Sequence, residues 1–287
     1  MRRLFLAAVL AALMLVPASS ASAALEGEYA KFKTCPLSNL TVEVCLYAES
    51  TTGEFTVGKK TVPLVNPVIL KGGAGGPEGI FGPLTIIAPT DGQVISKSAQ
   101  PVPGGLLGIT APSWWPQILK DLFNETINNG FTGVTATVEL AGSASSIKAS
   151  FVNALTGAGP AFSMPVKVKL SNPFLGSNCY IGSNSNPVKL NLTTGTTSPP
   201  PPNTPISGNP GEGGNIEEKI LFLKKNRLVD NSFSAPGASG CGGILFSWAV
   251  DPLVDSILGT PSPAGKNTAV LEGTTYLGIA EALRPML

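Results

Sequence analysis

The sequence predicts a mainly β protein, an antiparallel β-sandwich or barrel-like domain with two short helices and a long Pro/Gly-rich loop. Three observations predict this class. Apolar and polar residues alternate with a period of two through much of the chain, which is the pattern of half-buried strands. The 287 residues include 33 Gly and 26 Pro, which suit many turns, and 43% hydrophobic residues, which suffice for a core. Only 13% of the residues are charged, whereas disordered chains combine high charge with low hydrophobicity.

Residues 1–23, MRRLFLAAVLAALMLVPASSASA, have the pattern of a secretory signal peptide. Two arginines precede an apolar run over 4–16, and Ala21-Ser22-Ala23 forms an A-x-A cleavage site. The apolar run is short for a membrane span. We therefore expect a secreted protein, extracellular or associated with the cell envelope, with no stable membrane anchor. Residues 24–287 are expected to form a single β-rich secreted domain.

Period-two alternation identifies the expected strands. One apolar face is predicted in each of four segments: Leu40, Val42, Val44 and Leu46 in LTVEVCLYA; Val134, Ala136, Val138 and Leu140 in VTATVEL; Val166, Val168 and Leu170 in VKVKL; Val188, Leu190 and Leu192 in VKLNL. The segment GGAGGPEG, Gly72 to Gly79, is expected to be a flexible loop. LTIIAPTDGQVIS is expected to form a hairpin that turns at Asp91-Gly92, because glycine tolerates the positive φ of such turns.

Two segments carry helix signals. PQILKDLFNETINNG places Pro116 at a first helical position and ends at Asn129-Gly130, and Trp114-Trp115 are expected to anchor this helix to the core. DPLVDSILG offers Asp251 as N-cap, Pro252 at the first helical position and Gly259 as terminator. Both helices are expected to pack on an edge or a face of the sheet.

The four cysteines, Cys35, Cys45, Cys179 and Cys241, suggest disulfides in an exported chain. Three pairings are possible. We favour Cys35–Cys45 and Cys179–Cys241 because this pairing joins neighbours in sequence within each half of the chain. A Cys₄ zinc site is the rival interpretation, and it is disfavoured because no two cysteines have the C-x₂₋₄-C spacing of zinc sites.

The tract at 194–214 contains four consecutive prolines, Pro199 to Pro202, followed by Gly211, Gly213 and Gly214. Polyproline II is favoured here, and such a segment cannot enter a central strand. A domain linker is one interpretation. A Cys179–Cys241 bond would bracket the tract, so we prefer a stiff surface loop within one domain. Recognition of its PxxP spacings by signalling domains does not suit an exported chain.

The sequence excludes several kinds of chemistry. It has no histidine, which excludes Ser-His-Asp and Cys-His catalysis and most zinc enzymes. Without Arg2 and Arg3, 17 basic residues face 18 acidic ones, which argues against nucleic acid or an anionic membrane as the main partner. No catalytic, cofactor-binding or metal-binding residues are predicted, and no cofactor.

Carboxylates leave one enzymatic route open. Glu217, Glu218, Asp230, Asp251 and Asp255 could include an acid/base pair for glycoside hydrolysis. Asp251 and Asp255 are four residues apart and could share a helix face, although capping explains Asp251 without catalysis.

Three long segments carry a resemblance to a known group. PVKVKLSNPFLGSNCYIGSNSNPVKLNLTTGTTSPPPPNTPISG, LVDNSFSAPGASGCGG and PSPAGKNTAVLEGTTY resemble segments of uncharacterised secreted proteins of actinobacteria. The similarity extends over most of the mature chain. The resemblance implies export, and it supplies no catalytic residues and no disulfide pattern.

These observations predict a secreted, disulfide-stabilised, non-enzymatic protein that binds an extracellular or cell-envelope ligand or serves a structural role. A carboxylate-based hydrolase of extracellular or cell-wall polysaccharide is the first alternative. The second is a membrane-active β protein that inserts amphipathic strands. The first alternative requires two carboxylates facing one cleft, about 5–10 Å apart.

Overall fold

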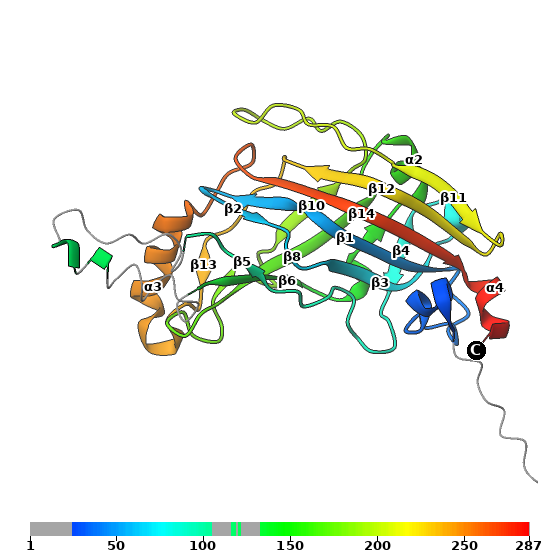
Figure 1. Ribbon diagram of the computed structural model, residues 1–287, viewed down its shortest axis with the longest axis horizontal. Coiled ribbons are helices and arrows are strands. Elements are labelled where there is room, and N and C mark those ends of the chain that lie inside the picture. The colour runs from blue at the N-terminus through cyan, green and yellow to red at the C-terminus, as the bar shows by residue number, and fades with distance from the viewer. Residues whose placement is uncertain (1–24, 105–115, 119, 122–132, 287) are drawn as a thin grey trace, which may run out of the picture.

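The computed structural model describes residues 25–104, 116–118, 120–121 and 133–286. As predicted, the protein is mainly β, with one large open antiparallel sheet of 14 strands and a few short helices (Figure 1). The strands are β1 (Val44–Val57), β2 (Lys60–Pro63), β3 (Val68–Gly75), β4 (Leu84–Ile87), β5 (Gln100–Pro101), β6 (Thr135–Leu140), β7 (Lys148–Ala149), β8 (Phe162–Ser171), β9 (Tyr180–Ile181), β10 (Val188–Leu192), β11 (Glu212–Ile216), β12 (Ile220–Asp230), β13 (Ala238–Ser239) and β14 (Thr268–Ile279). The α-helices are α2 (Phe151–Thr156), α3 (Gly243–Leu258) and α4 (Ala280–Leu283), and the 3₁₀ helices are η1 (Gly27–Phe32), η2 (Gly79–Phe81), η3 (Ala144–Ser146) and η4 (Arg284–Met286).

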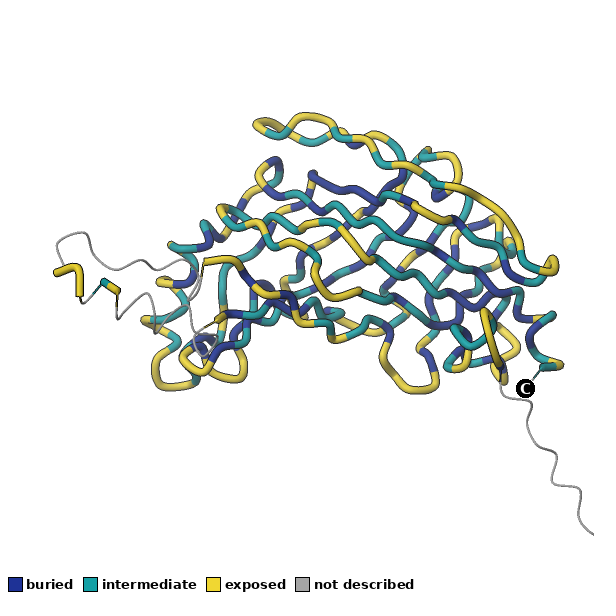
Figure 2. The backbone as a smooth tube through the Cα atoms, viewed as in Figure 1, coloured by how far each residue is buried: buried dark blue, intermediate teal, exposed yellow. Residues whose placement is uncertain are grey.

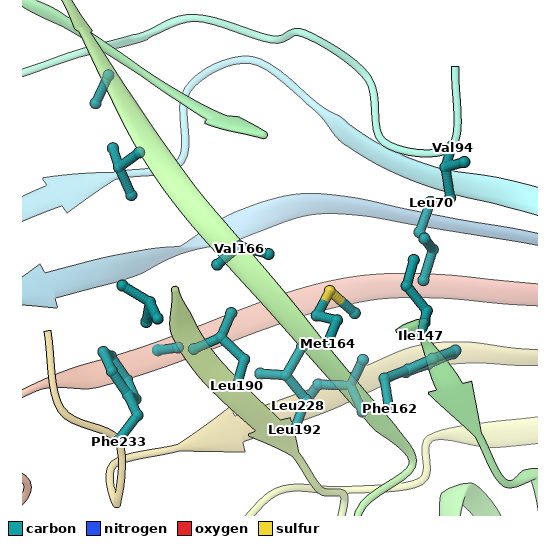
Figure 3. Packing of buried hydrophobic residues seen from close by; sticks show 14 of the residues in the cluster. Leu70, Val94, Ile147, Phe162, Met164, Val166, Leu190, Leu192, Leu228 and Phe233 are labelled. Atoms are coloured by element: carbon teal, nitrogen blue, oxygen red, sulfur yellow. The ribbon is translucent and has the colours of Figure 1, made fainter. Parts of the chain in front are cut away.

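The sheet bends so that its two halves face each other. Its main path runs β11-β12-β14-β1-β3-β4-β7-β8-β6-β5; β2 pairs with β1, β10 and β9 pair with β8, and β13 pairs with β9. The short strands β4 and β7 connect the two halves. An isolated bridge between Thr193, after β10, and Val229 of β12 joins the halves a second time. Inward side chains from β8, β10 and β12 meet in one shared core, as Figure 3 shows for Met164, Leu190 and Leu228.

Strand β8 follows the period-two rule closely. Its residues alternate between buried and half-buried along all ten positions, with Val166, Val168 and Leu170 on the buried face. The predicted faces of 134–140 and 188–192 are also found in β6 and β10, although Val138 and Leu140 are only partly buried. Leu40 departs from its predicted face: it is 82% exposed, because the strand begins at Val44 and a turn precedes it. In Figure 2 exposed backbone gathers mainly in the loops and at the edges of the sheet.

Two bulges meet at one glycine in the middle of the sheet. Thr51 is an extra residue in β1 and Lys225 an extra residue in β12, and both register shifts lie beside Gly273 of β14. A Cβ atom on Gly273 would lie 1.8 Å from the carbonyl oxygen of Glu49. Each bulge adds one residue to its strand, so the set of side chains that faces the core shifts from even to odd positions in β1. This shift turns Phe55 and Val57 inward.

The first half of the glycine-rich segment at 72–79 is not the expected flexible loop. Gly72 to Gly75 form the end of β3 beside β1 and β4. A Cβ on Gly73 would lie 2.8 Å from a methyl group of Val42, and one on Gly75 would lie 2.1 Å from the carbonyl oxygen of Thr41. The glycines are therefore explained by close packing of the chain on this strand rather than by a need for mobility.

The expected hairpin at 84–96 is also different. Strand β4 pairs with β3 and β7, and the segment after the turn returns beside β3 through the bridge Leu70–Ile95. The turn itself is placed correctly, since Gly92 has φ +71° and the Asp91 carboxylate accepts the Gln93 N–H at 3.0 Å. The turn residues predict where the chain reverses, but they do not predict which strand the following segment pairs with.

One end of the sheet is covered by the two ends of the described chain. Phe32 of η1 and Leu283 of α4 lie in a second buried cluster, on the outer face of the strands, together with the Cys35–Cys45 disulfide. The guanidinium of Arg284 donates to the carbonyl oxygens of Leu37 and Val42. These contacts hold the first and last described segments against each other.

The proline tract folds back along the sheet. Thr196 and Ser207 form a bridge, and the Asn203 side chain donates to the carbonyl oxygens of Asn231 and Asn267. The last residues of the expected loop, from Glu212 onward, belong to edge strand β11. The second disulfide, Cys179–Cys241, closes 62 residues around the tract. The tract is thus attached at several points to residues on both sides of it.

The helices differ from expectation in extent. Helix α3 begins at Gly243, eight residues before the predicted N-cap Asp251, and it ends as predicted before Gly259, whose φ is +73°. Of the helix expected at 116–130, Pro116, Gln117, Ile118, Lys120 and Asp121 are described, and all of these except Pro116 are helical. Trp114 and Trp115 lie outside the described residues. No described helix combines the length and the hydropathy needed to cross a membrane.

Candidate functional site: an apolar cavity inside the sheet

A cavity of about 150 Å³ lies between the two halves of the sheet. Its walls come from β1, β2 and β3 on one side, from β6, β8 and β10 on the other, and from single residues of β12, β14 and α3. Only five of the 28 lining residues are polar, namely Ser50, Glu54, Lys60, Ser98 and Gln100. The remaining lining is aliphatic, aromatic or proline, so the interior of the cavity offers almost no hydrogen-bonding partner.

The sequence shapes this cavity through the same rules that form the strands. The inward residues of β8, from Phe162 to Leu170, supply one wall by strict alternation. On the opposite wall the bulge at Thr51 turns Phe55 and Val57 toward the cavity. Small residues widen the space between the walls, because Ala48 and Ala136 stand where larger side chains would fill it.

The cavity reaches the surface beside β2. Its lining includes Glu54 and Pro63, which are both solvent-exposed and are paired across β1 and β2. We call these two residues, with the half-buried Lys60, the mouth. A ligand with an apolar part inside the cavity would place any polar part near the ammonium of Lys60, which pairs with the inward-facing Val57.

Hydrogen bonds hold the chain around the mouth in place. The buried Gln100 side chain accepts the N–H groups of Val65 and Asn66 at 2.8 and 2.9 Å, and donates to the Asn66 carbonyl oxygen. The Asn267 side chain accepts the Gly58 N–H at 3.0 Å and fixes the turn between β1 and β2. The walls near the mouth are therefore held by hydrogen bonds of the chain itself, and such largely formed walls are typical of small-molecule sites.

The C-terminal end of α3 lies against the same turn. Leu258 lines the cavity, and its carbonyl oxygen accepts the Lys59 N–H at 2.7 Å. The Lys59 ammonium donates to the Ser256 carbonyl oxygen at 3.2 Å. Helix α3 and the mouth thus share one end of the molecule, the end where β2 and α3 lie in Figure 1.

The carboxylates proposed for hydrolysis do not converge. Asp251 accepts the N–H groups of Gly240 and Cys241, and Asp255 accepts the Ala238 N–H and the Thr260 hydroxyl. Both carboxylates face backbone on the inner side of α3 and hold the segments at its two ends. Asp251 therefore serves as a cap for the loop before α3 and not, as predicted, as the helix N-cap.

Glu217 and Glu218 lie in the turn between β11 and β12, where both have positive φ. The Tyr29 hydroxyl donates to Glu217 at 2.8 Å, and this hydrogen bond, with the nearby Lys219 ammonium, lowers the pKa of Glu217. A general acid needs the opposite shift.

Asp230 is the one carboxylate of the five that is buried, at 2% exposure. Its oxygens accept the N–H groups of Asn191 and Ser232 at 2.7 and 2.9 Å. Burial raises the pKa of Asp230, while these two hydrogen bonds act in the opposite direction. Asp230 is absent from the cavity lining, where Glu54 is the sole carboxylate among the described residues.

The four cysteines are paired as Cys35–Cys45 and Cys179–Cys241, the pairing that the sequence favours, with Cα atoms 5.6 and 4.1 Å apart. Across the described ranges, no three Cys, Asp or Glu side chains gather into a possible metal site.

Sequence reasoning missed the cavity altogether. Period-two patterns show which side chains face inward, but a gap between two walls depends on how far apart the walls stand. The apolar run at the start of α3, GILFSWAV, could have indicated a longer helix. The predicted helix excludes this run because Asp251-Pro252 has the pattern of a helix start. Comparison with known proteins adds no template, since no protein family, curated protein or solved structure matches the chain.

Proposed function

We propose that this protein is an exported, non-enzymatic binding protein that takes a slender apolar group of a small ligand into its internal cavity. One observation carries the proposal, namely a preformed space of about 150 Å³ with an almost wholly apolar lining. Cavities of this size lined by Leu, Ile and Phe stay dry and accept benzene-sized molecules. The apolar lining favours hydrocarbon, and the charged mouth suits a ligand with one polar end.

Export is part of the proposal. It is supported by the signal-like residues 1–23, by the resemblance to secreted actinobacterial proteins, and by two disulfides, which persist in oxidising compartments. The hydrolase alternative loses support because its five carboxylates are spread over a turn, a buried strand and the inner side of α3. None of these residues lines the cavity.

The test is a chain-length series of straight-chain alcohols measured by isothermal titration calorimetry. Each buried methylene contributes about 0.8 kcal/mol, so affinity should rise about fourfold per methylene until the cavity is full. Affinity should then stop rising. Heat capacity should fall on binding, because apolar surface leaves water.

Two lining variants and one control sharpen this test. Ala136→Leu should end the rise at a shorter alcohol, and Met164→Ala should extend it to a longer one. Ala158→Leu adds the same bulk at an exposed position away from the cavity and should leave the series unchanged. An affinity that keeps rising without a plateau, or that responds equally to Ala136→Leu and Ala158→Leu, would show binding elsewhere and defeat the proposal.

A further inference from the structure

Helix α3 exposes an unusual amount of apolar surface. Eleven large apolar side chains are exposed among the described residues, and five of them lie on this one helix: Ile244, Leu245, Phe246, Trp248 and Leu253. Ile244 is 99% exposed and Trp248 is 79% exposed. We call these five residues the apolar face of α3. Single exposed apolar residues are common on proteins, but a contiguous patch indicates a site of interaction.

The two negative charges of α3 are held by backbone donors. Asp251 and Asp255 are the only charged residues of the helix, and both accept backbone N–H groups on its inner side, at 2.6 to 3.1 Å. Lys59 lies at the C-terminal end of the helix, where its ammonium reaches the Ser256 carbonyl oxygen. The exposed apolar side chains of α3 therefore have a cation nearby, at the C-terminal end of the helix, and both carboxylates of the helix are bound to backbone donors.

We infer that the apolar face of α3 docks on the surface of a lipid bilayer. Helices that lie in the membrane interface bury Trp, Phe and Leu at the boundary between headgroups and acyl chains, and they keep Lys or Arg beside that boundary. The five side chains and Lys59 match this chemistry. Trp248 suits the interface in particular, because its ring is apolar and its indole N–H can still find a polar partner there.

A second copy of the chain fits this face less well. Stable protein interfaces carry a polar rim with about one hydrogen bond per 100–200 Å². The apolar face of α3 has hardly any polar group besides the indole N–H, so it lacks the hydrogen bonds that such an interface needs.

Docking would bring the mouth of the cavity to the membrane. The turn between β1 and β2 is hydrogen-bonded to Leu258 at the end of α3, and Lys60 of the mouth follows Lys59 directly. The docking itself does not depend on the cavity having a ligand. Exchange of an apolar ligand between bilayer and cavity does rest on the proposed function.

The experiment measures binding to phosphatidylcholine vesicles, with and without added phosphatidylglycerol, in the absence of any small ligand. Trp114→Phe and Trp115→Phe leave Trp248 as the single tryptophan. Its emission should shift to the blue with vesicles, and it should become protected from an aqueous quencher. Leu245→Ser with Phe246→Ser should weaken partitioning into vesicles at least tenfold, because two large apolar side chains are no longer buried in the bilayer.

The matched control is Leu40→Ser with Phe81→Ser. These residues are 82% and 70% exposed, away from α3, and their replacement should leave vesicle binding unchanged. Three results would overturn the inference: no vesicle binding by the unmodified chain, an equal loss in the control, or a dimer in sedimentation that the α3 variant dissociates. A lower thermal midpoint of the α3 variant without vesicles would also overturn it, because another part of the chain would then cover this face. If the alcohols do not bind as described but the protein still binds vesicles, the proposed function is contradicted and the inferred docking is not.

Discussion

Gly273 shows how a single residue can decide the shape of a sheet. It lies opposite both bulges, with β1 on one side and β12 on the other. The backbone of Glu49 comes so close that no side chain can be accommodated at this position. The bulge at Thr51 orients Phe55 and Val57 into the cavity, so this contact between backbones also helps to form the candidate site. A glycine within a strand pattern signals such a close approach, but not which strand approaches.

Gly273→Ala should therefore destabilise the protein, by about 1–3 kcal/mol or more, because the new Cβ would meet a backbone oxygen that cannot rotate away. Gly213→Ala is the matched control. It also lies in a strand, and its nearest neighbour would be the Leu223 side chain at an ordinary 3.6 Å. Urea unfolding midpoints measure both effects. Equal midpoints for the two variants would contradict the role assigned to Gly273.

Asp230 makes stability depend on pH. Burial raises its pKa in the folded protein above the usual value of 3.8, so the folded state binds this proton more tightly than the unfolded state does. Ionised Asp230 thus lowers stability at neutral pH, and the penalty shrinks as the pH falls through the folded pKa toward the unfolded one. Relative to Asp230→Asn, the unmodified protein should gain stability between about pH 7 and about pH 4.

Asp91 provides the control with the opposite sign. The Lys71 ammonium, which donates a hydrogen bond to it, holds the pKa of Asp91 below its usual range. Relative to Asp91→Asn, the unmodified protein should show no gain over the same pH interval. Urea titrations at several pH values measure the unfolding free energies of the unmodified protein and of both variants. A difference between the unmodified protein and Asp230→Asn that stays constant with pH would refute the assignment.

At the scale of the element, α3 shows why a helix can begin earlier than its sequence signals suggest. Proline is favoured at the first helical position, and Asp251-Pro252 fits that rule. The structure instead extends the helix to Gly243. The Asp251 carboxylate holds the N–H groups of Gly240 and Cys241, just before the first turn. This tertiary contact stabilises two additional turns, and propensity alone could not foresee it. Pro252 lacks the N–H that would bond to the Trp248 carbonyl oxygen, and both residues are exposed, so this acceptor does not lie in the core.

The second disulfide acts on the elements that surround the proline tract. Cys179→Ser should lower the unfolding free energy by about 4 kcal/mol, the chain-entropy value for a loop of 62 residues. Unfolding should remain a single transition, because strands before and after the tract share one core that includes both Leu190 and Leu228 (Figure 3). Calorimetry and circular dichroism measure both quantities. Two separate transitions would instead support the linker interpretation of the tract.

At the scale of the whole molecule, the fold class was readable from the sequence, whereas the cavity was not. Strand β8 and strand β10 follow their alternation residue by residue. The glycines of β3 led to a wrong prediction of a flexible loop. Glycine is common both in flexible loops and where two backbones pack closely, and the sequence does not distinguish the two cases. The pairing of the segment after Asp91-Gly92 depends on which strand lies nearby, and a local turn signal contains no such information.

The candidate site was hidden for a related reason. A wall formed by Val166 and Met164 looks the same in sequence whether the opposite wall touches it or stands a few ångströms away. The volume of the cavity depends on the sizes of many side chains together and on how the bulges orient them. The disulfide partners, by contrast, could be chosen from sequence separation alone, because short loops close more readily than long ones.

The cluster formed by η1, α4 and the Cys35–Cys45 bond has a practical consequence. Leu25 and Leu283 lie in that cluster, so both ends of the described chain emerge at the side of the sheet opposite to α3 in Figure 1. A fluorophore, an affinity tag or an immobilising linker joined at either end would therefore hold the molecule with its mouth and its apolar helix pointing away from the support. Surface-based assays with vesicles or ligands flowing past can be built on that orientation.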